Sequence, residues 1–254
     1  MTTVLFVGGL DSSGWAGLLR DCAAAAEFGV RTKVAATAVT AQTDGALSAH
    51  YPVPGPVVAR QIEAAGAVDA VKVGMLSTAG VVSALDGALS RYAGPVVLDP
   101  VLAASSGAAL LTLGGLALLV ERVLPRVTLL TPNLPELAVL ASALGLSGAA
   151  EAEIVAAIMA RGTAAVLVKG GHDSTPARCE DRLYLRAAAD PLRFDDPLRF
   201  DGPRHPISLR GTGCHLASAI AAALALGADL PEAVRQGRAS LDQRFRTEMA
   251  SRAA

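Results

Sequence analysis

Short apolar runs alternate with longer alanine-rich segments along the chain, and this alternation constrains the fold more than any other feature. The apolar runs, which we interpret as strands, cover residues 4–7, 30–40, 70–74, 95–100, 127–130 and 164–169. The segments interpreted as helices cover residues 16–28, 56–65, 78–92, 113–123, 151–161, 217–226 and 231–250. Because no linker or composition break divides the chain, we predict one α/β domain over residues 1–254. Its central sheet should be mostly parallel, with helices on both faces.

The pattern changes between residues 178 and 205, where short alternating runs predict antiparallel hairpins. Residues 190–195 are repeated without change as residues 196–201. A unit of this length is far too short for a solenoid repeat, so we interpret it as a local duplication that lengthens a hairpin or a loop.

Charge and composition exclude several kinds of partner. The net charge is −1, with Lys and Arg scattered, so we expect no nucleic acid as a main partner. The longest apolar run, around residues 217–226, is too short to span a membrane, and a strand that follows Met1 almost at once argues against a signal peptide. Cys22, Cys179 and Cys214 show no zinc-site spacing or disulfide framework, which suits a reducing cytoplasm.

Two glycines near the C-terminal end, Gly211 and Gly213, lie between a strand-like run at 206–209 and the helix predicted from residue 217. Glycines let the backbone bend so that several N–H groups point one way, and the helix adds its positive dipole end, which together favour phosphate binding. Cys214 lies in this turn, where a thiol is expected to have a lowered pKa, so it is a candidate base or nucleophile. The alternative is a tight turn in which Cys214 is a small buried apolar residue.

Polar residues follow several of the predicted strands, at the edge where ligand sites of open α/β sheets lie. Gln42 carries a donor and an acceptor that suit a polar heterocycle. Asp99 is well placed for Mg²⁺ or phosphate chemistry, and Lys169, followed by two glycines, suits a nucleotide phosphate. The simpler alternatives are a loop amide that faces water, a turn cap and a surface lysine.

Two further positions carry open alternatives. Asn133 and Glu136 lie three residues apart at a helix start, where they could hold Mg²⁺ through waters or form a capping box. Asp21, inside the helix predicted at 16–28, is expected to be a solvated charge. Residues 8–14, just before that helix, are predicted to form a loop.

Several motifs occur in one order along nearly the whole chain. They are Gly-x-Asp-x-Ser-Gly-x-Ala-Gly at 9–17, Thr-Ala-Gln at 40–42, Lys-x-Gly-Met-Leu at 72–76, Leu-Asp-Pro-Val at 98–101, Thr-Pro-Asn-Leu-Pro-Glu at 131–136, Val-Lys-Gly-Gly-His at 168–172 and Gly-Thr-Gly-Cys at 211–214. This order resembles the hydroxymethylpyrimidine/phosphomethylpyrimidine kinases of thiamine biosynthesis, in the ribokinase-like superfamily. The resemblance implies a three-layer sandwich and a homodimer.

The resemblance also implies an activity, which is ATP-dependent phosphorylation of 4-amino-5-hydroxymethyl-2-methylpyrimidine and then of its monophosphate. Cys214 would take the proton of the substrate hydroxyl, within an anion hole formed by Gly211, Thr212, Gly213 and Cys214. Gln42 would hydrogen-bond the pyrimidine, and the substrate pocket would be lined by Gly9, Asp11, Ala16, Met75 and Val101. Mg²⁺ would be organised by Asp99, Asn133 and Glu136, and ATP would contact Lys169 and Thr212.

The chain departs from the family pattern at a few positions. Trp15 replaces a usual glycine, where it could narrow the substrate pocket or form a new wall. Ser105 and Ala108 replace a usual Lys and Asp, whereas Arg210 and His215 replace a usual His and Thr. Arg210 could restore the positive charge that Ser105 lacks. Two alternatives stay open: a vitamin kinase of the pyridoxal type on the same fold, and a pyrimidine-binding protein without catalysis.

Overall fold

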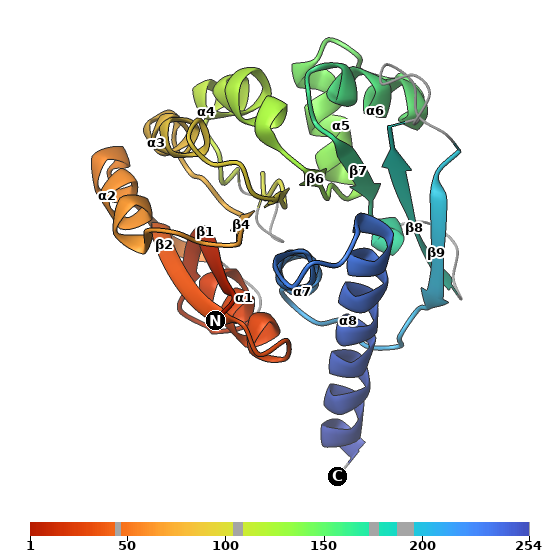
Figure 1. The fold of residues 1–254 in the computed structure, drawn as a ribbon. Helices are drawn as coiled ribbons and strands as arrows, with labels where there is room; N and C mark the ends of the chain where they lie inside the picture. Colours follow the sequence, from red (N-terminus) through yellow and green to blue (C-terminus); the bar gives the residue numbers. More distant parts are fainter. Residues whose placement is uncertain (44–46, 104–108, 173–177, 187–195, 254) are drawn as a thin grey trace.

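The structure is a computed structural model that describes residues 1–43, 47–103, 109–172, 178–186 and 196–253. Its centre is one nine-stranded sheet with the strand order β3-β2-β1-β4-β5-β6-β7-β8-β9 (Figure 1). The strands are β1 (Thr3–Asp11), β2 (Arg31–Gln42), β3 (Leu47–Pro52), β4 (Ala70–Val73), β5 (Val96–Leu98), β6 (Leu129–Leu130), β7 (Ala165–Val168), β8 (Arg178–Leu185) and β9 (Leu198–Pro203). Neighbouring strands are parallel from β2 to β7, and β3, β8 and β9 pair antiparallel at the two ends.

Helices cover both faces of this sheet, as the sequence predicts (Figure 1). They are α1 (Gly17–Ala26), α2 (Gly55–Ala65), α3 (Ala79–Leu89), α4 (Leu113–Leu118), α5 (Leu134–Ala143), α6 (Glu151–Ala160), α7 (Thr212–Ala225) and α8 (Leu230–Ala253). One face carries α1, α7 and α8, and the other carries α2 to α6. The prediction of a three-layer α/β sandwich is therefore confirmed. None of the described helices has both the length and the apolar composition to cross a membrane.

The two cores follow from the alternation of side chains along each strand. On β1, Val4 and Phe6 pack toward α1 and α7, whereas Leu5 and Val7 pack toward the opposite layer. The alanines of α7 between residues 217 and 223 are fully buried. Because alanine adds little volume, α7 can lie close to the middle of the sheet, and its first turn is carried to the sheet's carboxyl edge.

Some local predictions are wrong. Residues 8–11 continue β1 instead of forming a loop, because Gly9 to Asp11 pair with β2 beyond a register shift. No strand forms at residues 206–209, since β9 ends at Pro203 and Pro206 has no N–H to donate to a ladder. The helix predicted from residue 217 begins earlier, at Thr212, directly after the left-handed Gly211.

The remaining differences concern helix ends and the duplicated segment. The helix predicted at 113–123 is α4 followed by a π-helical turn over Leu119–Val123. The first copy of the repeated sequence, 190–195, lies outside the described residues. The second copy contributes to β9, which pairs antiparallel with β8, so the predicted hairpin character of this region is confirmed there.

Candidate active site

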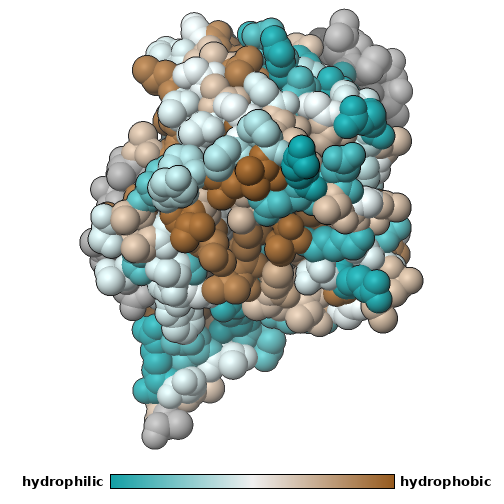
Figure 2. Space-filling model, turned by 90° about the vertical axis from the view of Figure 1, so that its left-hand side faces the viewer, coloured by the Kyte–Doolittle hydropathy of each residue, from teal (hydrophilic) through white to brown (hydrophobic). Residues whose placement is uncertain are grey.

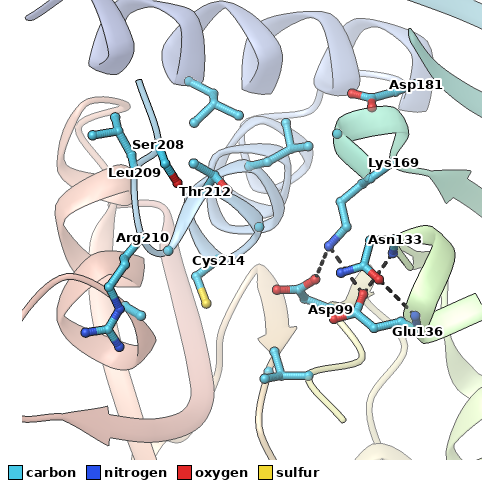
Figure 3. Close-up of a pocket in the computed structure, with 18 of the residues that line it drawn as sticks. Asp99, Asn133, Glu136, Lys169, Asp181, Ser208, Leu209, Arg210, Thr212 and Cys214 are labelled. Carbon is cyan, nitrogen blue, oxygen red and sulfur yellow. Dashed lines mark hydrogen bonds and ion pairs between the residues drawn. The ribbon is translucent and has the colours of Figure 1, made fainter. Parts of the chain in front are cut away.

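A cavity of about 1440 Å³ lies at the carboxyl edge of the parallel strands. Its wall is built by residues at or just after the carboxyl ends of β1, β2, β4, β5 and β7, by the first turn of α7 and by one face of α8. Every site residue predicted from the sequence lines this cavity, namely Gly9, Asp11, Ala16, Gln42, Met75, Asp99, Val101, Asn133, Glu136, Lys169, Gly211, Thr212, Gly213 and Cys214. Figure 3 shows how part of this set lies together.

The glycine turn meets three other segments at close range. Gly211 has a φ of 67°, and a Cβ there would lie 2.2 Å from the carbonyl oxygen of Trp15. A Cβ on Gly213 would lie 3.1 Å from Lys169 Nζ and 3.4 Å from Asp99 Oδ2. The first N–H groups of α7 have no partner within the helix, and their residues line the cavity beside the Lys169 ammonium group. This arrangement suits an anion.

Cys214 lies in this first turn, but the prediction of a lowered pKa is wrong. Desolvation raises the pKa of the Cys214 thiol to about 11. Lys72 and the N–H of Gly17 lower it, whereas Asp21 and Asp99 add to the rise. Because the removal of water outweighs the helix end, the thiol is protonated at neutral pH in the ligand-free protein.

A buried ion pair lies behind Cys214, and the sequence analysis missed it. Asp21 is fully buried instead of solvated, and its Oδ1 lies 2.8 Å from Lys72 Nζ. Ser218, one helical turn after Cys214 on α7, donates to the same oxygen at 2.8 Å. Asp21 raises the pKa of Lys72 against the effect of burial, so this lysine stays charged. A lysine inside an otherwise apolar strand was the signal that could have revealed the pair.

A second charged cluster joins side chains from three parts of the chain beside the glycine turn (Figure 3). Lys169 Nζ, after β7, lies 2.7 Å from Asp99 Oδ1 and 3.6 Å from Glu136 Oε2. Burial raises the pKa of Glu136 to about 7, because the attraction of Lys169 only partly offsets it. Lys169 and Lys72 hold the pKa of Asp99 below its usual range. Asn133 and Glu136 form the reciprocal capping box of α5, which was one of the two alternatives.

The predicted substrate side of the cavity is shaped by an ordered loop. The Asp11 carboxylate accepts hydrogen bonds from Ser13 and from the N–H of Ala16, so it fixes the loop that leads into α1. Gln42 lies on the same wall, and its backbone N–H donates to Ser12 Oγ at 3.1 Å. The role predicted for Asp11 is therefore at least partly structural.

The departures from the family pattern fall in different places. Trp15 is 41% exposed and does not line the cavity, so the expectation that it narrows the pocket is wrong. Arg210 does line the cavity, where it donates to the Thr43 carbonyl at 2.6 Å and to Ser13 Oγ at 3.3 Å. His215 is fully buried between α7 and α8. Ser105 and Ala108 lie outside the described residues.

One face of α8 also lines the cavity, and the sequence analysis did not single it out. Arg238 and Phe245 belong to this face, and the His205 ring stacks on Phe245 with centroids 4.5 Å apart. His205 Nε2 also lies 2.7 Å from Asp242 Oδ1. The helical spacing of these residues on a polar helix was the available signal.

Comparisons with known proteins agree with this geometry. A sequence model of the phosphomethylpyrimidine kinase family matches residues 11–253. The hydroxymethylpyrimidine/phosphomethylpyrimidine kinase of Rhizobium meliloti is 38% identical over 249 residues, which are 95% of this chain and 90% of the relative. A crystal structure of phosphomethylpyrimidine kinase from Clostridium difficile has a TM-score of 0.79, 26% identity, and coverage of 96% and 100%. Pyridoxal kinase of Staphylococcus aureus with ADP has a TM-score of 0.80, 27% identity, and coverage of 95% and 87%.

Proposed function

Because the chain belongs to the phosphomethylpyrimidine kinase family, we propose that it transfers the γ-phosphoryl group of ATP to 4-amino-5-hydroxymethyl-2-methylpyrimidine and then to the monophosphate of that alcohol. The observation that carries this proposal is the single cavity that joins the glycine turn of α7, the Lys169 cluster and the Gln42 wall. Phosphoryl transfer needs positioning and charge stabilisation above all, and the cavity supplies backbone donors and a cation for both.

We assign the transferring phosphoryl group to the anion hole formed by Gly211, Thr212, Gly213 and Cys214. The N–H groups of this turn are preorganised, so they stabilise charge without rearrangement during the reaction. Cys214 takes the proton of the substrate hydroxyl late in the transfer, when bond formation has made that proton acidic. This step requires the thiolate, which is the minor form at neutral pH because the thiol pKa is about 11.

We propose that ATP and Mg²⁺ bind at the Lys169 cluster. Oxygen donors are the ligands that Mg²⁺ prefers, and Asp99 and Glu136 present carboxylates around one ammonium group, with Asn133 beside them. No compact group of three metal-binding side chains occurs among the described residues, so we propose that these residues hold Mg²⁺ partly through waters. The ion would neutralise phosphate charge, while Lys169 and Thr212 bind the phosphate oxygens.

The pyrimidine ring is assigned to the opposite wall. The Gln42 amide can give and accept one hydrogen bond each, which matches a ring nitrogen and its neighbouring amino group. Gly9 lets the Met75 side chain approach the backbone, since a Cβ at residue 9 would lie 2.9 Å from Met75 Sδ and would displace that side chain. Asp11 fixes the loop, and Ala16, Met75 and Val101 complete a small, mainly apolar wall that fits a flat ring.

Kinetic assays test this function directly. Full-length protein with MgATP should release ADP in the presence of the hydroxymethylpyrimidine, and Cys214→Ala or Gly213→Ala should abolish turnover while the fold stays intact by circular dichroism. Pyridoxal kinase activity is the second candidate, which the structural similarity to the Staphylococcus aureus enzyme favours. Side-by-side kinetics with both alcohols decide between them. Binding of the pyrimidine without consumption of ATP would contradict both.

We further propose that the chain is one kinase domain over residues 1–254 that acts in the cytoplasm as a homodimer. The three cysteines are unpaired thiols, which suits a reducing compartment. Figure 2 shows an apolar area on the side of the molecule that carries the β3 edge of the sheet. The exposed large apolar residues of β2 and β3 are Val34, Val39 and Tyr51. Light scattering after size exclusion should give twice the chain mass.

A further inference from the structure

Asp181 is a nearly buried carboxylate that joins two parts of the cavity wall. It lies on β8 with 4% exposure. Its Oδ1 accepts the N–H of Gly170 at 2.8 Å, and its Oδ2 forms an ion pair with Arg238 of α8. Figure 3 shows Asp181 beside the short helical turn that follows Lys169. The carboxylate therefore links the loop after β7 to the C-terminal helix.

Two hydrogen bonds, of which Asp181 accepts one, fix the backbone on both sides of the Lys169 side chain. The N–H of Lys169 donates to the carbonyl of Pro132 at 2.8 Å, and the next N–H, that of Gly170, donates to Asp181. Residue 170 must be glycine, because a Cβ there would lie 1.9 Å from the carbonyl oxygen of Glu180. Hydrogen bonds from backbone N–H groups to a carboxylate are short and strong, so the peptide has little freedom to rotate.

The direction of the lysine depends on that peptide. Lysine has a flexible stem with four methylene groups, so its reach is set at one end by the backbone and at the other by the ion pairs with Asp99 and Glu136. In the structure this group lies 2.7 Å from Asp99 Oδ1 and 3.1 Å from the Cβ position of Gly213. Rotation of the Gly170 peptide would carry the ammonium group away from the anion hole, and errors of position are costly in phosphoryl transfer.

We propose that Asp181, held by Arg238, is a positioning residue for phosphoryl transfer that aims Lys169 at the phosphoryl group. The inference rests on the proposed function. It gives Asp181 no contact with the substrate, so its effect passes through the loop. A positioning role also gives the Asp181–Arg238 ion pair a function other than stability, since two apolar residues at these positions could stabilise the fold equally well.

The chain offers a matched control on the same strand. Arg182 follows Asp181 on β8 and points to the opposite face of the sheet. There it forms a bidentate ion pair with Glu151, with Nε 2.7 Å from Oε1 and Nη2 2.9 Å from Oε2. Neither Arg182 nor Glu151 lines the cavity. Replacement of Glu151 therefore disturbs a comparable ion pair on the same strand without touching the loop after β7.

The test compares steady-state kinetics of full-length wild type, Asp181→Leu, Asp181→Asn and Glu151→Gln with MgATP and the pyrimidine alcohol. Asp181→Leu should lower kcat/KM for ATP by about ten- to a hundred-fold, as expected for loss of a charge-assisted hydrogen bond. Asp181→Asn, whose amide oxygen still accepts from Gly170, should lower it by about five-fold. KM for the alcohol should stay constant, and Glu151→Gln should lower only the melting temperature.

The outcomes separate this inference from the proposed function. Should Asp181→Leu fail to fold, the nearly isosteric Asp181→Asn decides. Unchanged kcat/KM for ATP in a folded Asp181→Asn variant overturns the inference. Calorimetry with the Mg²⁺ complex of a non-hydrolysable ATP analogue gives a second readout, in which Asp181→Leu should bind more weakly than Glu151→Gln. A wild type that binds the analogue but phosphorylates no alcohol overturns the proposed function, whereas equal affinities in the two variants overturn the role of Asp181.

Discussion

The buried imidazole of His215 should make a contribution to stability that is lost in mild acid, and His215→Gln should remove this pH-dependent contribution. His215 Nε2 lies 2.7 Å from Ser240 Oγ, and Ser240 Oγ lies 2.6 Å from Glu27 Oε2. Because Ser240 donates its only proton to Glu27, it accepts from Nε2–H. The other ring nitrogen, Nδ1, then carries no proton and has no partner among the described residues. Burial and the nearby Arg244 and Arg20 lower the pKa of His215 to about 4.

The sign and size of the effect follow from this shift. The folded state binds the proton more weakly than the unfolded state, whose histidine pKa is 6.5. The contribution to stability is therefore complete above pH 6.5 and is lost as the pH falls toward 4. The loss amounts to about 2 kcal/mol at pH 5 and about 3 kcal/mol below pH 4. Glu136, whose pKa is raised to about 7, acts in the opposite direction, so the wild-type curve alone is not diagnostic.

Urea denaturation of wild type and His215→Gln at pH 7.5 and pH 5 isolates the histidine. Glutamine keeps an N–H donor for Ser240 but does not titrate, and the contribution of Glu136 cancels in the difference between the two proteins. The free energy of unfolding of wild type relative to the variant should fall by about 2 kcal/mol between the two pH values. A difference that stays constant within a few tenths of a kcal/mol would refute the reasoning.

Three further predictions concern the cavity wall. Gly211→Ala should lower kcat by about a hundred-fold or more, because φ of residue 211 is positive and a Cβ there would lie 2.2 Å from a carbonyl oxygen. The control Gly29→Ala also has a positive φ but open space around the Cβ, so it should keep wild-type kcat. Lys72→Met should lower the free energy of unfolding, measured by urea denaturation, by about 3–5 kcal/mol, because it leaves Asp21 buried without its ion-pair partner. The double variant Lys72→Met/Asp21→Leu should recover most of that loss. With Cys214 as the base and its pKa at about 11 in the ligand-free protein, log(kcat/KM) for the alcohol should rise by about one unit per pH unit near neutrality. A flat profile would exclude the thiolate as the base.

The sequence predicts the layers and the edge of the sheet at which the site lies, because both depend on local periodicity. Apolar runs place the strands, and their polar end residues, such as Gln42, Asp99 and Lys169, all line one cavity. The failures at residues 8–11 and 206–209 arise where pairing between distant segments decides the structure. A strand continues where a neighbouring strand supplies backbone hydrogen-bond partners, as β2 does for Asp11. The run at 206–209 pairs with no neighbouring strand among the described residues and therefore forms none.

The electrostatics of the site could not be predicted from the sequence. Asp21 and Lys72 are 51 residues apart, and only the packing of α1 on the sheet brings them together. The same packing removes water from Cys214, so its pKa rises where a helix N-terminus alone would lower it. Asn133 and Glu136 could be interpreted as a capping box from their spacing, because that contact is local.

Mass spectrometry of the pyrimidine products is the most direct test of the claim that this cavity carries a phosphoryl group from ATP to a hydroxymethylpyrimidine. Purified protein, MgATP and the alcohol should yield a species heavier by one phosphoryl group and then one heavier by two, with one ADP formed for each group transferred. If the alcohol and its monophosphate both keep their original masses while the protein remains folded, the account is contradicted.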